Sequence, residues 1–194
     1  MAPPPSDWDI VQEVRSGDAR SFRRLVKMHE SQAMTLAVRV LKSREEAEEI
    51  VQDAFVRAFR NLHQFRGEAK FGTWLHRIVY NLCMTKVSRR RNDCLHQSLD
   101  EPGIDLPMAD ESGSSGLEQL QDRELRQYLT KAVDELPEKL RTVVTLFYVH
   151  EMKYNEICTV MDLPEGTVKT YLFRGRAMLR KKFSSSLMKE VTAA

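Results

Sequence analysis

The stretch SLDEPGIDLPMADESGSSGLEQLQD, residues 98–122, limits the folds open to this chain more than any other feature of the sequence. It carries seven acidic residues, two Pro and three Gly, with no Lys or Arg and almost no aromatic or β-branched residue. Such a segment cannot bury enough apolar surface to offset the entropy that is lost on ordering. We therefore expect a flexible acidic linker between an N-terminal domain, residues 6–97, and a C-terminal domain, residues 123–186.

The N-terminal half shows helical periodicity and no convincing strand. Apolar residues recur at helical spacing from Phe22 to Val40, and Asp18 is a plausible N-cap for this first long helix. The next helix opens with SREE, where Ser43 and Glu46 fit a capping box. A third helix is predicted over about residues 73–90. The half is therefore expected to be a small helical domain.

The C-terminal half is expected to be helical as well. The pattern predicts helices over 123–135, from Pro137 to about residue 150, and over 154–161. The turn DLPEG follows, in which Pro164 prevents helix continuity, and Thr167 is the expected cap of a longer helix to about residue 183. A short helix, a tight turn and a longer helix are the layout of a helix-turn-helix. The predicted fold class is all-α, with two small helical domains.

The longer helix carries a basic run, GTVKTYLFRGRAMLRKK, that contains no acid although the whole chain has a net charge of only +2. Cations concentrated in this way suit a polyanion, because Lys and Arg that neutralise phosphates release condensed counterions. A solvated basic helix face is the plain alternative. The preceding short helix and the turn with Pro favour a helix that reads DNA.

Composition excludes several other classes of protein. With 42% hydrophobic and 30% charged residues the chain is typical of a globular protein, and no apolar run approaches the ~20 residues of a membrane span. The start, MAPPPSDWD, lacks the order of a secretory signal, and three scattered cysteines suit a reducing cytoplasm. Cys94 and His96 could supply two metal ligands, but no second pair exists, so we predict neither a metal site nor a cofactor.

Two blocks of sequence resemble a known family. The block LPEKLRTVVTLFYVHEMKYNEICTVMDLPEGTVKTYLFRGRAMLR resembles the promoter-reading C-terminal domain of bacterial extracytoplasmic-function (ECF) sigma factors, a group of the sigma-70 family. The block EEAEEIVQDAFVRAFRNLHQFRGEAKFGTWLHRIVYNLC resembles their N-terminal domain. The resemblance covers about residues 8–183. It implies an alternative sigma factor that binds core RNA polymerase, directs initiation at promoter DNA, and serves a stress or envelope response under the restraint of an anti-sigma factor.

The resemblance also implies which residues do this work in the N-terminal domain. The surface expected to dock on polymerase is a polar stripe on the second helix that consists of Glu49, Gln52, Asp53, Val56 and Arg60. The surface expected to hold the melted minus-ten element mixes aromatic and basic residues, namely Phe65, Arg66, Lys70, Phe71, Trp74, Arg77, Asn81 and Lys86. Aromatics interleaved with cations suit single-stranded DNA, whose bases stack and whose phosphates need neutralising. Trp74 is equally compatible with a place in the core.

In the C-terminal domain, the residues expected at the minus-thirty-five element are Lys169, Thr170, Phe173, Arg174 and Arg176. Lys169, Arg174 and Arg176 match the family pattern, whereas Tyr171 replaces a frequent Arg. Arg can pair with guanine through two hydrogen bonds, and residues early in a recognition helix reach base edges.

Two other classes of function are alternatives. An enzyme is disfavoured because the sequence has no phosphate-binding Gly loop, no zinc-protease helix and no nucleophile elbow. A stand-alone helix-turn-helix regulator would explain the C-terminal half but not the N-terminal block. Specific binding of the purified chain to duplex promoter DNA, without polymerase, would distinguish this alternative from a sigma factor.

Overall fold

The computed structural model describes residues 6–96 and 127–193, and every regular element in those two stretches is a helix. The first stretch holds α1 (Asp7–Arg15), the 3-10 helix η1 (Ala19–Ser21), α2 (Phe22–Leu41), α3 (Arg44–Arg60), the 3-10 helix η2 (Leu62–Gln64) and α4 (Phe71–His96). The second holds a helical segment over 127–134, then α6 (Glu138–Tyr148), α7 (Tyr154–Met161) and α8 (Glu165–Ala193). The all-α class is confirmed. The predicted linker, 98–122, lies outside the described residues, and the domain boundaries stay predictions.

Side chains at the helix ends explain where the predicted helices begin. The Ser43 hydroxyl accepts a hydrogen bond from the backbone N–H of Glu46 at 3.3 Å, so the Ser43 half of the predicted capping box of α3 is present. The Glu46 carboxylate does not complete the box, because it pairs with Arg90 and Lys86 of α4. The predicted cap of α2 is displaced. Asp18 accepts from the backbone N–H of Arg20 at 3.1 Å and caps η1, the short turn that leads into α2. Two predicted helices are also longer than expected, since α4 continues to His96 and α8 to Ala193.

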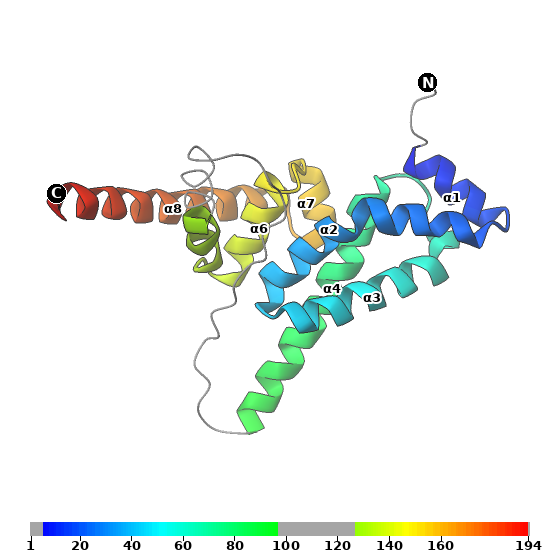
Figure 1. The fold of residues 1–194 in the computed structure, drawn as a ribbon, viewed down its shortest axis with the longest axis horizontal. Coiled ribbons are helices and arrows are strands. Elements are labelled where there is room, and N and C mark those ends of the chain that lie inside the picture. Colours follow the sequence, from blue (N-terminus) through cyan, green and yellow to red (C-terminus); the bar gives the residue numbers. More distant parts are fainter. Residues whose placement is uncertain (1–5, 97–126, 194) are drawn as a thin grey trace, which may run out of the picture.

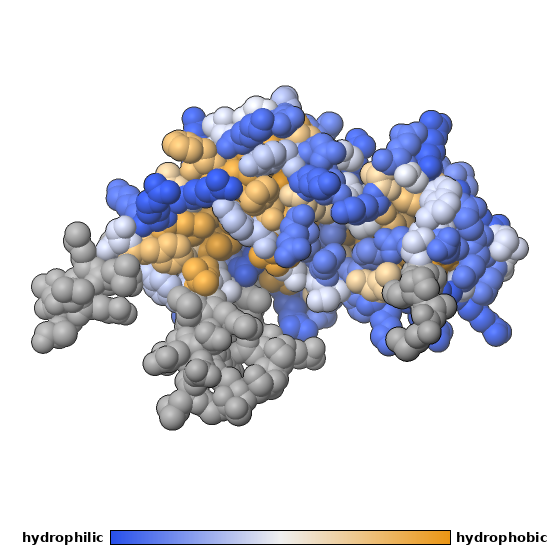
Figure 2. Space-filling model, turned by 90° about the horizontal axis from the view of Figure 1, so that it is seen from above, coloured by the Kyte–Doolittle hydropathy of each residue, from blue (hydrophilic) through white to orange (hydrophobic). Residues whose placement is uncertain are grey.

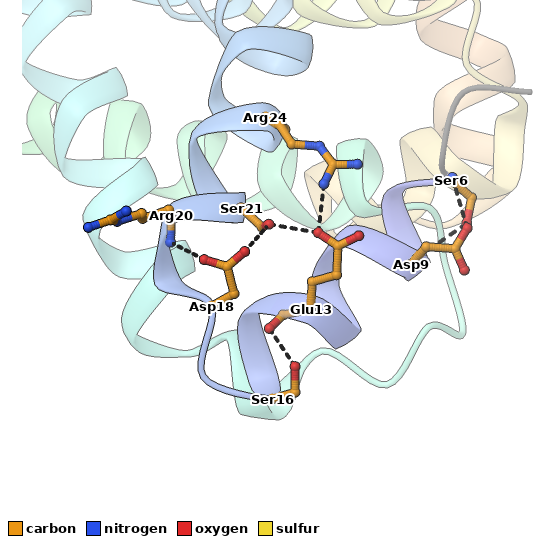
Figure 3. A network of polar contacts seen from close by, with 8 residues as sticks. All are labelled: Ser6, Asp9, Glu13, Ser16, Asp18, Arg20, Ser21 and Arg24. Carbon is orange, nitrogen blue, oxygen red and sulfur yellow. Dashed lines mark hydrogen bonds and ion pairs between the residues drawn. The ribbon is translucent and has the colours of Figure 1, made fainter. Parts of the chain in front are cut away.

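A polar network fixes the turn between α1 and α2 (Figure 3). The Ser21 hydroxyl lies 2.7 Å from a carboxylate oxygen of Asp18 and 2.6 Å from one of Glu13. The same Glu13 oxygen accepts from Arg24 of α2 at 2.6 Å. The end of α1 is thereby tied to the first turns of α2, which places α1 against the helical bundle.

The core of the N-terminal half is formed by α2, α3 and α4, which pack against one another (Figure 1). Leu36 of α2, Ala54 of α3 and Leu75 of α4 are fully buried there. At one end Phe22 packs edge-on against Phe59, with ring centroids 5.1 Å apart. Burial of these apolar faces is the main force that holds the three helices together.

The C-terminal half packs directly on the N-terminal half, which the sequence did not indicate. Helix α7 lies against α4 and α6 lies against α2 (Figure 1), and the buried apolar residues of both halves form one continuous cluster. Ion pairs flank this contact. Lys70 lies 3.3 Å from a carboxylate oxygen of Glu156, and Arg91 lies 3.1 Å from one of Glu138.

Two arginines, one from each half, bind groups of the opposite half at the contact. The buried Arg141 of α6 donates from Nε to the backbone carbonyl of Arg39 at 2.5 Å. Its Nη1 donates to the carbonyls of Asp134 and Leu136, both at 3.0 Å. In return, Arg39 of α2 forms an ion pair with the Asp134 carboxylate. Each half therefore supplies a guanidinium that satisfies groups of the other half.

Two histidines meet at the same contact. His76 of α4, which is 1% exposed, packs edge-on against His150, with ring centroids 4.8 Å apart. Within the described residues, none of their four ring nitrogens makes a hydrogen bond of normal geometry, and the backbone carbonyl of Gly72 acts only weakly on His76. The nearby His29 also acts electrostatically on His76, but its own Nε2 pairs with Asp7 at 3.1 Å. A buried imidazole without a partner is stable only in its neutral form.

The histidine pair predicts a pH dependence of folding. Burial, together with the neighbouring His150, lowers the pKa of His76 to about 3, and burial lowers the pKa of His150 to about 4. An unfolded histidine takes up its proton at a pH of about 6.5. Below that pH, the histidines of the unfolded chain therefore bind protons, whereas the buried histidines of the folded chain stay neutral. The contribution of the two histidines to the free energy of unfolding is therefore fully present above about pH 6.5. It falls as the pH falls, by up to about 1.4 kcal/mol per pH unit for each histidine.

Urea unfolding at a series of pH values from neutral down to about 4 measures this slope. His76→Gln should flatten it, because the variant keeps a polar side chain but loses the titrating ring. His63→Gln, at an exposed position outside the contact, is the control and should keep the slope of the wild type. The same slope in His76→Gln as in the control would contradict the assignment.

Candidate nucleic-acid interface

The predicted helix-turn-helix is present in the structure. Helix α7 ends at Met161 and its C-cap is Asp162, whose φ of 53° is left-handed, and α8 begins at Glu165 directly after Pro164. The expected cap was misplaced. Thr167 lies within the first turn of α8, and its backbone N–H donates to the Pro164 carbonyl at 2.9 Å. Helix α8 thus begins two residues earlier than predicted, at Glu165 instead of Thr167, and the turn is shorter by those two residues.

Helix α8 separates a packing face from an exposed face. Val168, Leu172 and Gly175 are buried against α6 and α7. The five residues predicted at the minus-thirty-five element are all exposed, namely Lys169, Thr170, Phe173, Arg174 and Arg176. The structure therefore brings this whole set together on the accessible surface of one helix.

The cations of α8 have different surroundings. Lys169 pairs with Glu165 one turn earlier at 2.7 Å, and that hydrogen bond raises the pKa of the exposed Lys169 ammonium. Arg176 lies over two aromatic rings. Lys182 forms an ion pair with Glu135. Arg174 has no ion-pair or hydrogen-bond partner within the described part of the chain, so its guanidinium is available to an added anion.

Gly175 allows α8 to approach α6 closely. A Cβ at this position would lie 2.8 Å from Cγ2 of Val144, a distance that real side chains do not adopt. Helical periodicity in the sequence predicted Gly175 on the packing face but gave no sign of this requirement. Because the glycine sits between Arg174 and Arg176, the close approach also fixes where these two side chains leave the helix.

The predicted minus-ten residues divide into surface and core. Arg66, Lys70, Arg77 and Asn81 are exposed, and Trp74 is half-buried. Phe65 and Phe71, by contrast, are only 4% and 1% exposed. Their rings lie 5.7 Å apart at 84°, and each lies within 6 Å of the Trp74 ring. A ring buried in this way has no face to offer to a base, so in this conformation Phe65 and Phe71 shape the loop instead of forming its surface.

Lys86 does not join the other minus-ten residues. It lies 2.7 Å from a carboxylate oxygen of Glu49 and 3.9 Å from one of Glu46, both on α3. Asn81 is five residues earlier on α4, which is more than one helical turn and leads to a different face. The structure therefore places Lys86 beside the predicted polymerase-docking stripe.

The predicted docking stripe is fully displayed on α3. Glu49, Gln52, Asp53 and Arg60 are exposed, and Val56 is 47% exposed. Phe59, which is not among the predicted docking residues, is 43% exposed beside them. The signal that could have found it is its position three residues after Val56, which puts both on one side of the helix.

Other predicted absences concern metals and membranes. No cluster of three or more His, Cys, Asp or Glu side chains in the described part of the chain could hold a metal ion. The side chains of Cys94 and His96 fall outside that part.

Burial raises the pKa of the Cys83 thiol to about 12, which makes it unreactive. Among the helices described, none is long and apolar enough to cross a membrane.

Comparisons with known proteins identify both halves. Residues 25–92 match the family Sigma-70 region 2, and residues 126–179 match Sigma-70, region 4. The chain is 33% identical over 176 residues to the ECF RNA polymerase sigma factor SigW of Bacillus subtilis, covering 89% of this chain and 94% of SigW. It is also 33% identical to the ECF RNA polymerase sigma-E factor of Escherichia coli, over 91% of this chain and 94% of that protein.

The chain belongs to the ECF sigma factors.

Solved structures share the sigma-factor fold. The sigma factor RpoE of Bartonella quintana, solved with the anti-sigma factor NepR, superposes with a TM-score of 0.70 at 18% identity, over 85% of this chain and 98% of RpoE. CnrH, solved with the cytosolic domain of CnrY, gives 0.64 at 21% identity, over 93% of this chain and 99% of CnrH. In this ECF sigma factor, region 2 includes α2, α3 and most of α4, and region 4 includes α6, α7 and the first half of α8.

The close approach at Gly175 can be tested by stability measurements. Gly175→Ala should lower the free energy of unfolding by about 1–3 kcal/mol relative to Gly166→Ala, because its methyl group overpacks the contact with Val144. Gly166 is the matched control, since nothing lies within 4 Å of its Cβ position. Both glycines lie in α8, Gly166 in its first turn and Gly175 in its interior, so overpacking acts in Gly175→Ala against a gain in helix propensity that is at least as large as in the control.

Val144→Ala added to Gly175→Ala should recover part of this difference, because it removes the obstructing methyl group. Chemical denaturation of the wild type and of these three variants gives the four free energies of unfolding. Equal stability of Gly175→Ala and Gly166→Ala would show that α6 and α8 are not in the close contact described.

Proposed function

We propose that this chain is an alternative sigma factor that binds core RNA polymerase reversibly and directs initiation at a specific class of promoters. The observation that carries the proposal is the order of two sigma regions on one chain, with the predicted docking stripe of region 2 and the predicted DNA-reading residues of region 4 exposed. The chain would act as an initiation factor, and the chemistry of RNA synthesis would belong to polymerase.

Three surfaces would divide the work. The stripe on α3, with Asp53 and Val56, would dock on polymerase, because a mixed polar and apolar surface suits a reversible interface. The exposed face of α4 with Arg77 and Asn81 would hold the melted minus-ten strand. Helix α8 would read the minus-thirty-five element from the major groove, where Arg174 has no competing partner in the described part of the chain.

An anti-sigma factor is the second partner that we propose. The solved sigma factor RpoE was captured with the anti-sigma factor NepR, and its fold matches this chain. Restraint by such a protein, in a stress or envelope response, would make the activity conditional.

Run-off transcription with core polymerase tests the function as a whole. The purified chain should confer transcription from a subset of genomic promoters, and it should bind duplex promoter DNA specifically only in the presence of core enzyme. Specific binding without polymerase, together with no run-off product, would instead support the stand-alone regulator.

The docking stripe predicts a selective loss of polymerase binding. Gln52→Lys with Asp53→Lys should weaken binding to core enzyme at least tenfold, or about 1.4 kcal/mol, because the two cations alter the charge of the docking stripe. Fluorescence titration of labelled chain with core polymerase measures the affinity.

The matched control is Glu30→Lys with Gln32→Lys, which makes the same change of charge at exposed positions on α2. It should bind nearly as the wild type does. If both double variants bind equally well while remaining helical, α3 is not the docking surface.

The exposed face of α4 predicts a defect in promoter melting. Asn81→Ala should reduce open-complex formation more than closed-complex binding, because the amide can both donate to and accept from an extruded base edge. Extruding a base costs on the order of a few kcal/mol, so loss of its pocket slows melting. Permanganate footprinting measures the open complex, and a template with a pre-melted bubble should restore transcription.

Asn92→Ala is the control, because it removes the same side chain from an exposed position three turns along the same helix. It should melt promoters normally. The pocket assignment fails if the bubble template gives Asn81→Ala no advantage over duplex DNA.

A further inference from the structure

Two cations of α8 rest on aromatic rings that belong to other helices. Cζ of Arg176 lies 5.5 Å from the ring centroids of both Phe147 and Tyr148, at the end of α6. Nζ of Lys169 lies 5.7 Å from the ring centroid of Tyr154, at the start of α7. All three distances fall within the ~6 Å over which a cation is attracted to a ring face.

The three rings form a continuous surface, which we call the aromatic platform (Phe147, Tyr148 and Tyr154). Phe147 stacks on Tyr154 with centroids 5.4 Å apart at 16°, and it meets Tyr148 edge-on at 5.0 Å and 82°. Tyr148 remains 52% exposed. The platform therefore lies at the molecular surface beside the helix-turn-helix. Figure 2 shows that apolar surface gathers over the half of the molecule that holds α6 and α8.

The register of α8 divides its exposed cations into two sets. Lys169 and Arg176 are seven residues apart, close to two helical turns, so both lie on the flank that adjoins the platform. Thr170 and Arg174 are four residues apart on a different face. Among the described residues, the Arg174 guanidinium lies over no aromatic ring, and the Thr170 hydroxyl donates to the carbonyl of Gly166 at 2.8 Å.

Stacking leaves a guanidinium able to bind an anion. When a ring covers one face of the planar group, the N–H donors at its edges still point outward. A side chain that is already held in place loses less conformational entropy on binding than a free one does. Held cations at the flank of a recognition helix suit the phosphates that border the groove, and phosphate contacts fix position without reading sequence.

We propose that the aromatic platform positions Arg176 and Lys169 as a phosphate-binding pair and leaves base reading to Arg174 and its neighbours. Phe147, Tyr148 and Tyr154 are thus positioning residues. The proposal rests on the proposed reading of promoter DNA by α8, and it assigns to three residues outside that helix a part in the same contact. The competing explanation is that the rings only secure α8 to α6 and α7.

A double-mutant cycle separates these explanations. Holoenzyme is reconstituted from core RNA polymerase and the full chain, and its binding to duplexes randomised across the minus-thirty-five element is measured at several salt concentrations. The variants are Arg174→Ala, Arg176→Ala, Tyr148→Leu, Tyr148→Phe, and Tyr148→Leu combined with Arg176→Ala. Tyr148 suits this test because it is half-exposed, and thermal unfolding of each variant checks its stability.

The proposal expects Arg176→Ala to lower affinity for all sequences and to reduce the slope of log affinity against log salt by about 0.9, the loss of one phosphate contact. Tyr148→Leu should lower affinity in the same sequence-independent way. The combined variant should bind no more weakly than Arg176→Ala alone, because the platform acts through the arginine. Tyr148→Phe keeps the ring and should bind as the wild type does. Arg174→Ala should change base preference.

Three results would overturn the proposal while leaving the reading of DNA by α8 intact. These are wild-type binding by Tyr148→Leu, losses that multiply in the combined variant, and a change of base preference in Tyr148→Leu. A different result overturns the proposed function of α8 itself, namely wild-type affinity and base preference in both Arg174→Ala and Arg176→Ala.

A second cycle provides an independent check should Tyr148→Leu prove unstable. Tyr154→Leu and Lys169→Ala address the other end of the platform. Their combined variant should bind as Lys169→Ala does, whereas multiplied losses would again assign the rings a purely structural role.

Discussion

The arrangement of the two halves depends on the buried guanidinium of Arg141. It serves three backbone carbonyls at once, one from Arg39 of α2 and two from the residues that lead into α6. Burial lowers the pKa of this group, but the nearby carboxylates of Asp134 and Glu138 oppose that effect, so the charge is retained. A carbonyl left without a partner costs about 1–3 kcal/mol, and this one side chain prevents three such losses. The helical segment 127–134, α6 and α2 are therefore held at a common point, from which α7 and α8 take their places.

The sequence predicted the helices well because their determinants are local. The spacing of apolar residues, the cap at Ser43 and the break at Pro164 each act within a few residues. The contact between the halves could not be predicted in this way. Arg39 and Asp134 are 95 residues apart in the sequence, and each alone resembles an ordinary charged residue on a helix surface. The same applies to His76, whose burial depends on α7 and His150 covering one face of α4. Where a long segment separates partners, single-sequence patterns carry no information about pairing.

Some residues of the candidate site could also be placed from the sequence, and others could not. The exposed side chains of α3 and α8 follow from helical register once the buried faces are known, and the structure places all ten of these predicted residues at the surface. Aromatic residues were harder to place, because a large ring suits a core and a base equally well. Phe65 and Phe71 proved to be core, whereas Phe147 and Tyr148, which end an apolar helix in the sequence, lie beneath Arg176. Only the packing of α8 on α6, made close by Gly175, brings those rings and that cation together.

Helix α4 connects these surfaces through three faces. One face, with Leu75 and Val79, fills the core of the N-terminal half. The next, with Thr73 and His76, meets the C-terminal half. The third, with Asn81, is exposed. Lys70, just before the helix, lies where the second and third faces join. Its ammonium is largely exposed but already paired with Glu156 of α7, 3.3 Å away. A phosphate bound by Lys70 would therefore have to compete with that carboxylate, so the proposed binding of DNA on the third face and the contact between the halves would both require the Lys70 ammonium.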